Sequence, residues 1–189
     1  MIYIPNLLTL LRIALVPWLI VMLQDNQYLI SLLIFAAAGI TDALDGFIAK
    51  RFNAVTKLGA ILDPLADKAL LVSSYVMLSI MEIVPFWLTV TVVFRDILIV
   101  GGYLIILLFF SSAGFEEVKT KPLKISKLNT FLQITFIASV LAALAWSFDL
   151  TLFTQIFSYV ILITCIWSGA AYVYIGSVRA TNYSEPSNG

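Results

Sequence analysis

Long apolar stretches recur along the whole chain and leave few folds open to it. Six of them reach membrane-spanning length, at about residues 6–23, 28–49, 58–80, 86–110, 128–146 and 150–175. The chain has 189 residues, of which 61% are hydrophobic and 12% charged, and this composition is typical of helical membrane proteins. We therefore expect an all-α integral membrane protein with six transmembrane helices. Residues 1–178 would form one domain, and the polar residues 179–189 a disordered cytoplasmic tail.

The basic residues are unevenly distributed among the joints between these stretches. The first, third and fifth joints carry Asp25, Glu82 and Asp149 and no lysine or arginine. The other joints and the end of the last stretch carry Lys50, Arg51, Lys57, Lys119, Lys121, Lys124, Lys127 and Arg179. Because basic residues are retained on the cytoplasmic side, we expect both termini there, in a multi-pass protein of the cytoplasmic membrane.

Four aspartates interrupt the second and third apolar stretches. Asp42 and Asp45 are three residues apart and Asp63 and Asp67 are four apart, so each pair projects from one face of a helix. A short polar connection makes the two helices antiparallel neighbours, so the pairs can meet. From the helical rise, they lie roughly 12–15 Å in from the cytoplasmic edge, in a cavity open to the cytosol.

Converging carboxylates in a medium of low dielectric need a compensating positive charge. Oxygen ligands select Mg²⁺, Mn²⁺ or Ca²⁺, and two such ions held by shared carboxylates are suited to in-line phosphoryl displacement. The structural alternative is a set of helix-capping or ion-paired aspartates. Gly46 and Gly59 would leave room for a base or phosphate to approach the backbone, and the cations near residue 50 would attract an anionic substrate.

Other charged residues also fall within the apolar stretches, where charge is costly and marks candidate functional groups. Arg12 and Arg95 are expected to line a polar pocket, although Arg95 could instead pair with Asp96. Lys68 could pair with a neighbouring aspartate or face headgroups. The absence of histidine excludes Ser-His-Asp triads and histidine-rich zinc sites, and the single cysteine, Cys165, excludes an internal disulfide.

Around the aspartates the sequence resembles the CDP-alcohol phosphatidyltransferase family. The family signature is Asp-x2-Asp-Gly-x2-Ala-Arg-x8-Gly-x3-Asp-x3-Asp, and its positions are matched by Asp42, Asp45, Gly46, Ala49, Gly59, Asp63 and Asp67. Lys50 stands where the family has arginine, and Arg51 follows it. Lysine offers a point charge in place of a two-pronged donor, so Arg51 could take over the phosphate contact.

The resemblance implies a reaction and a set of roles. CDP-diacylglycerol would bind near Gly46, Ala49, Lys50, Arg51 and Gly59, with Arg12 also contributing. Two divalent cations, Mg²⁺ or Mn²⁺, would be bound by Asp42, Asp45, Asp63 and Asp67, with Asp67 also acting as general base. Arg95, Lys124 and Lys127 are the expected acceptor-binding residues. The resemblance further implies a homodimer, and nothing points to a nucleic-acid partner.

Two acceptors remain possible. FRDILIV and ISKLNTFLQI look more like the family's cardiolipin synthases, which use phosphatidylglycerol, than its phosphatidylglycerophosphate synthases, which use glycerol 3-phosphate. We expect cardiolipin and CMP as products, with phosphatidylglycerophosphate synthesis as the alternative. A cation transporter is a more distant alternative, since transport sites are expected near mid-membrane in two repeated halves and no second copy of the aspartate pattern occurs.

Overall fold

Six α-helices fill the part of the chain that the computed structural model describes, residues 3–52, 59–110 and 124–184. They are α1 (Tyr3–Gln24), α2 (Tyr28–Phe52), α3 (Gly59–Ile80), α4 (Phe86–Phe110), α5 (Lys124–Trp146) and α6 (Thr151–Ser184). All regular secondary structure in these ranges is helical, which confirms the prediction of an all-α protein.

The predicted boundaries agree with the helices to within three residues except at two ends. α5 begins at Lys124, four residues before its predicted apolar stretch, and α6 continues to Ser184, so residues 179–184 are helical and not part of a disordered tail. Hydropathy marks the length of chain suited to lipid, whereas a helix continues as long as its backbone hydrogen bonds can form.

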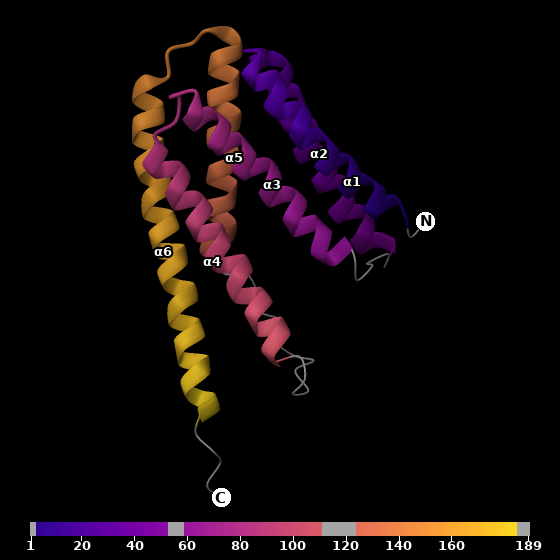
Figure 1. Ribbon diagram of the computed structural model, residues 1–189, viewed down its shortest axis with the longest axis vertical. Helices are drawn as coiled ribbons and strands as arrows, with labels where there is room; N and C mark the ends of the chain where they lie inside the picture. The colour runs from indigo at the N-terminus through magenta and orange to yellow at the C-terminus, as the bar shows by residue number, and fades with distance from the viewer. Residues whose placement is uncertain (1–2, 53–58, 111–123, 185–189) are drawn as a thin grey trace, which may run out of the picture.

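The helices form an up-and-down bundle in which α3 is central (Figure 1). It packs against α1 on one side and against α4 and α5 on the other. α1 also packs on α2, and α6 packs on α4 and α5. The turns that join α1 to α2, α3 to α4 and α5 to α6 all lie at one end of the bundle (Figure 1).

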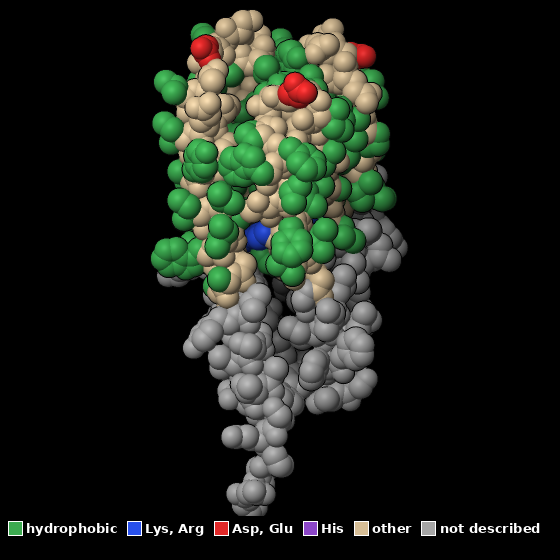
Figure 2. All heavy atoms as spheres, turned by 60° about the vertical axis from the view of Figure 1, so that its left-hand side comes forward, with side chains coloured by type: hydrophobic (Ala, Val, Ile, Leu, Met, Phe, Trp, Pro, Cys, Tyr) green, Lys and Arg blue, Asp and Glu red, His purple; other side chains and the backbone are tan. Residues whose placement is uncertain are grey.

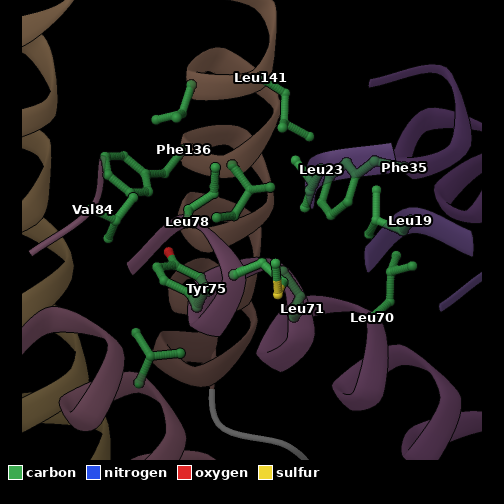
Figure 3. Packing of buried hydrophobic residues seen from close by; sticks show 14 of the residues in the cluster. Leu19, Leu23, Phe35, Leu70, Leu71, Tyr75, Leu78, Val84, Phe136 and Leu141 are labelled. Carbon is green, nitrogen blue, oxygen red and sulfur yellow. The ribbon is translucent and has the colours of Figure 1, made fainter. Parts of the chain in front are cut away.

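Side chains of α3 link the two halves of the apolar core. Tyr75 and Leu78 point toward Phe136 of α5, while Leu70 and Leu71 lie on the side of α1 (Figure 3). The rings of Tyr75 and Phe136 stack with their centroids 6.1 Å apart. Because both faces of α3 are packed, its rotation about its own axis is constrained by core contacts as well as by the charged groups described below.

The bundle exposes more large apolar side chains than a water-soluble domain does, and it buries several polar and charged ones beside its apolar core. Large apolar side chains are exposed along the helices, among them Trp18, Phe94, Ile163 and Trp167, each more than half exposed. The buried set includes Arg12, Ser31, Ser74, Arg95, Asp96, Asn129, Gln133, Ser158 and Ser168. Figure 2 shows apolar side chains covering the described face, with acidic side chains at the end farthest from the grey residues. Such a surface suits a surrounding of lipid.

The lengths and compositions of the helices support a membrane location in part. Among the described residues, Ile125–Trp146 and Thr151–Ala171 are long and apolar enough to cross a membrane, and the apolar segments Thr9–Gln24 and Tyr28–Asp42 are shorter. The number of spans and their orientation remain predictions.

Three helices end with a residue in the left-handed conformation. Asn26, Glu82 and Ser147 have φ values of 57°, 59° and 56° and lie one or two residues after the ends of α1, α3 and α5. Beyond α1, the amides of Asn26 and Gln27 donate to the carbonyls of Leu23 and Met22, at 3.0 and 2.8 Å. This is the Schellman arrangement, which satisfies the last carbonyls of a helix and turns the chain tightly.

We predict that Ser147→Gly stabilises the protein by about 0.5–1 kcal/mol. Serine is strained in the left-handed conformation and glycine is not, although glycine loses more backbone entropy on folding, which offsets part of the gain. Thermal unfolding in detergent measures the change. Asn26→Gly is the matched control and should gain less, since asparagine tolerates this conformation. Equal shifts, or a loss at Ser147, would contradict this account.

Candidate functional site

The side chain of Arg12 lies between two of the predicted site aspartates. Its Nη1 is 3.1 Å from Oδ1 of Asp42 on α2 and forms a short contact with Oδ1 of Asp67 on α3. The Arg12 side chain is 1% exposed, whereas those of Asp42 and Asp67 are 48% and 40% exposed. One buried guanidinium nitrogen of α1 therefore brings together a carboxylate from each aspartate pair, and each carboxylate keeps a solvent-accessible side.

Small residues allow the three helices to approach at this level. Ala38 of α2 and Ala66 of α3 are buried, at 0% and 1% exposure, and Thr9 of α1 is fully buried one turn before Arg12. The other small residues before Asp42 do not contribute in the same way. Ala36, Ala37 and Gly39 are exposed, and a Cβ added at Gly39 would meet nothing within 4 Å. Of the run at residues 36–39, only Ala38 is buried in the bundle.

The charges and donor atoms at this site suit a divalent cation. Two carboxylates against one guanidinium leave one negative charge, on oxygen atoms that Mg²⁺ and Mn²⁺ accept as ligands. Within the described residues no group of three or more potential metal ligands assembles. Any further carboxylate would come from Asp45 or Asp63, which lie in α2 and α3 as predicted but whose side chains are outside the described set.

A second charged network lies on the other side of α3. Both oxygens of the buried Asp96 on α4 are engaged, Oδ2 by Nζ of Lys68 at 2.8 Å and Oδ1 by Nη1 of Arg95 at 2.7 Å. Nη2 of Arg95 donates to the hydroxyls of Ser126 on α5 and Ser168 on α6, at 2.6 and 3.0 Å. The pairing of Arg95 with Asp96 is thus present. Lys68 pairs with neither Asp67 nor Asp63 in any described contact, and its partner is on α4.

Sequence reasoning did not anticipate the polar cluster next to this network. Asn129 on α5 accepts a hydrogen bond from Thr164 of α6 at 2.8 Å, and the amides of Asn129 and Gln133 point at Sγ of Cys165, at 3.4 and 3.6 Å. Asn129 and Gln133 are four residues apart in a predicted apolar stretch, which is the signal that would have indicated a shared buried face.

The structure describes the surroundings of only some of the remaining predicted site residues. Lys127 is exposed on the first turn of α5. Gly46, Ala49, Lys50 and Arg51 lie in α2, Gly59 at the start of α3 and Lys124 at the start of α5, and their surroundings are outside the described set. The binding roles assigned to all of these residues, and to Arg12 and Arg95, remain predictions.

The chain belongs to the CDP-alcohol phosphatidyltransferase family, whose model matches residues 2–167. Together with its lipid-suited surface, this membership places the chain among membrane proteins. It is 33% identical to the cardiolipin synthases (CMP-forming) of Homo sapiens and Rattus norvegicus over 184 residues, which are 92% of this chain and 61% of each relative. The chain thus spans about three-fifths of the length of these curated relatives.

A second kind of relative shares the same core. The CDP-diacylglycerol–glycerol-3-phosphate 3-phosphatidyltransferase of Bacillus subtilis is 31% identical over 152 residues, covering 72% of this chain and 75% of the relative. The family resemblance inferred from the aspartate pattern is confirmed by both kinds of relative.

We predict that Arg12→Met destabilises the protein by about 1–3 kcal/mol, because it removes the buried cation that contacts two half-buried carboxylates. Thermal unfolding of the detergent-purified protein at low divalent-ion concentration measures the loss. Arg12→Lys keeps the positive charge and should lose less. Unchanged stability in Arg12→Met would show that the bridge does not hold α2 and α3 to α1.

Proposed function

We propose that this protein transfers the phosphatidyl group of CDP-diacylglycerol to phosphatidylglycerol, giving cardiolipin and CMP. The observation that carries the reaction class is the meeting of Asp42 and Asp67, two members of the family's aspartate pattern, at one nitrogen of Arg12. The choice of acceptor is supported by the 33% identity to cardiolipin synthases over 92% of the chain.

The four aspartates are proposed to hold two divalent cations, Mg²⁺ or Mn²⁺. When bound, such ions neutralise the diphosphate and stabilise the charge that develops on the attacking and leaving oxygens. The buried guanidinium of Arg12 keeps Asp42 and Asp67 together, and the exposed sides of these carboxylates stay available to bind the ions. The oxygen-only donor set agrees with these ions and disfavours zinc and copper.

The proposed chemistry is a single displacement at phosphorus. The acceptor hydroxyl oxygen attacks the phosphorus that carries diacylglycerol, and the bond from this phosphorus to the bridging oxygen breaks. CMP leaves with the bridging oxygen, and the hydroxyl proton passes to the carboxylate of Asp67 as general base. Arg12 orients that carboxylate through its hydrogen bond.

Glycerol 3-phosphate is the second candidate acceptor, favoured by the similarity to the Bacillus subtilis enzyme. The two acceptors make different demands on the site. Glycerol 3-phosphate carries a phosphomonoester and needs converging cations, whereas phosphatidylglycerol needs a lateral opening to lipid. Arg95 is turned inward to Asp96 and two serines, which gives it little freedom to bind a free phosphate and so favours phosphatidylglycerol.

The membrane arrangement we propose has six spans, with both termini and the active site on the cytoplasmic side of the inner membrane. It is supported by the three acidic joints without basic residues, which lie at one end of the bundle (Figures 1 and 2). The acyl chains of the substrates would remain in the leaflet while the charged headgroups enter the cavity.

For the reaction, we predict that the purified full chain, supplied with labelled CDP-diacylglycerol and both acceptors, forms cardiolipin and releases CMP only when Mg²⁺ or Mn²⁺ is present. Thin-layer chromatography or mass spectrometry identifies the lipid. Phosphatidylglycerophosphate as the only product would replace our acceptor by glycerol 3-phosphate, and full turnover in chelator would contradict the metal site.

The matched variant in this assay is Asp67→Asn, which preserves shape and removes the proton acceptor. Its turnover should fall about 10²- to 10⁴-fold. Undiminished turnover would remove Asp67 from the role of base.

For the orientation, we predict that a cysteine introduced at Asp149 reacts with a membrane-impermeant thiol reagent added outside intact cells, whereas one introduced at Lys127 reacts only after the membrane is opened. Both positions are exposed, and Cys165, which is buried, is first replaced by serine so that it gives no background. The reverse labelling pattern would place the active site on the outer face.

A further inference from the structure

Two adjacent residues of α3 form ionic contacts on different sides of the helix. Asp67 contacts Arg12 of α1, and Lys68 contacts Asp96 of α4. Consecutive residues of an α-helix are about 100° apart around its axis, so these contacts act in different directions on the same turn. Together they limit the rotation of α3 in both senses at the level of the predicted base.

Asp96 is well placed to resist movement of Lys68. It is 3% exposed, and each of its carboxylate oxygens accepts a hydrogen bond from a different cation. Arg95, which it also binds, is tied to α5 and α6 through Ser126 and Ser168. The contacts that start at Lys68 therefore reach α4, α5 and α6. A rotation of α3 alone would have to break the contact between Lys68 and Asp96.

We propose that the Lys68–Asp96 bridge is a positioning device for Asp67, with Asp96 and Lys68 as positioning residues. It fixes the rotation of α3 so that the Asp67 carboxylate faces Arg12 and Asp42. This inference rests on the proposed function, in which Asp67 is a metal ligand and base. It assigns to Lys68 and Asp96 a role in metal affinity, although neither side chain is a proposed ligand.

The competing role for this network is direct binding of the acceptor. The geometry argues against it for Arg95, whose Nη1 and Nη2 both donate to protein groups and whose side chain is 4% exposed. Lys68 is 24% exposed, but its Nζ is 2.8 Å from a buried carboxylate. An anionic acceptor would have to displace Asp96 from Lys68 and leave that carboxylate with one partner fewer.

The test is a titration of the detergent-purified full chain with Mn²⁺, followed by the electron paramagnetic resonance signal of the free ion. Lys68→Met should bind Mn²⁺ about 10- to 100-fold more weakly than the wild type, the range usual for residues that orient metal ligands. Lys68→Arg can still reach Asp96 and should restore most of the affinity. Asp96→Asn, if thermal unfolding shows it folded, should resemble Lys68→Met.

Ser74→Ala is the control, because it removes a buried polar group of α3 whose hydroxyl donates to the carbonyl of Leu70 in the same helix. It should bind Mn²⁺ as the wild type does. Wild-type Mn²⁺ affinity in Lys68→Met, with a raised KM for the acceptor alone, would overturn the positioning role and indicate acceptor binding.

The product assay separates this inference from the proposed function. A wild type that forms cardiolipin, alongside a Lys68→Met variant with unaltered Mn²⁺ binding, contradicts the inference alone. A wild type that binds no Mn²⁺ contradicts the proposed metal site, and the positioning role falls with it.

Discussion

The structure depends on the pairing of two positively charged guanidinium groups, those of Arg12 and Arg95, which are buried inside an apolar bundle. A charge removed from water costs several kcal/mol unless it is paired and hydrogen-bonded, and more when the surroundings are lipid. Arg12 meets this condition with carboxylates of α2 and α3, and Arg95 meets it with Asp96 and two hydroxyls. The helices can pack in this arrangement because these partners are present, so the polar groups define the packing as much as the apolar core does.

The apolar core and the site depend on each other through α3. Toward the end with the acidic turns, Tyr75 and Leu78 pack α3 against α5 (Figure 3), and toward the other end Ala66 is buried in the bundle. Asp67 follows Ala66 directly, so the residue that permits close packing stands next to the residue that the proposed chemistry requires. A larger side chain at Ala66 would not fit this buried position unless α3 moved away from its neighbours.

Much of the fold follows from the printed sequence, because hydropathy and spacing report local properties. The start of α4 at Phe86, the end of α5 at Trp146 and the placing of the aspartate pairs on α2 and α3 were all predictable. The partner of Lys68 was not, since Asp96 is 28 residues away and only the packing of α3 on α4 joins them. The position of Arg12 was not predictable for the same reason. The sequence predicts α2 beside α3, but it does not show that α1 packs against both.

The short turns at the acidic end have a consequence for motion. Asn26, Glu82 and Ser147 close three helix ends so tightly that each following helix begins within a few residues. Helices tethered in this way separate mainly by tilting about the tethered end, and the displacement grows with distance along the axis. Farther from these turns, the contacts of Arg12 with Asp42 and Asp67 oppose such tilting of α1, α2 and α3.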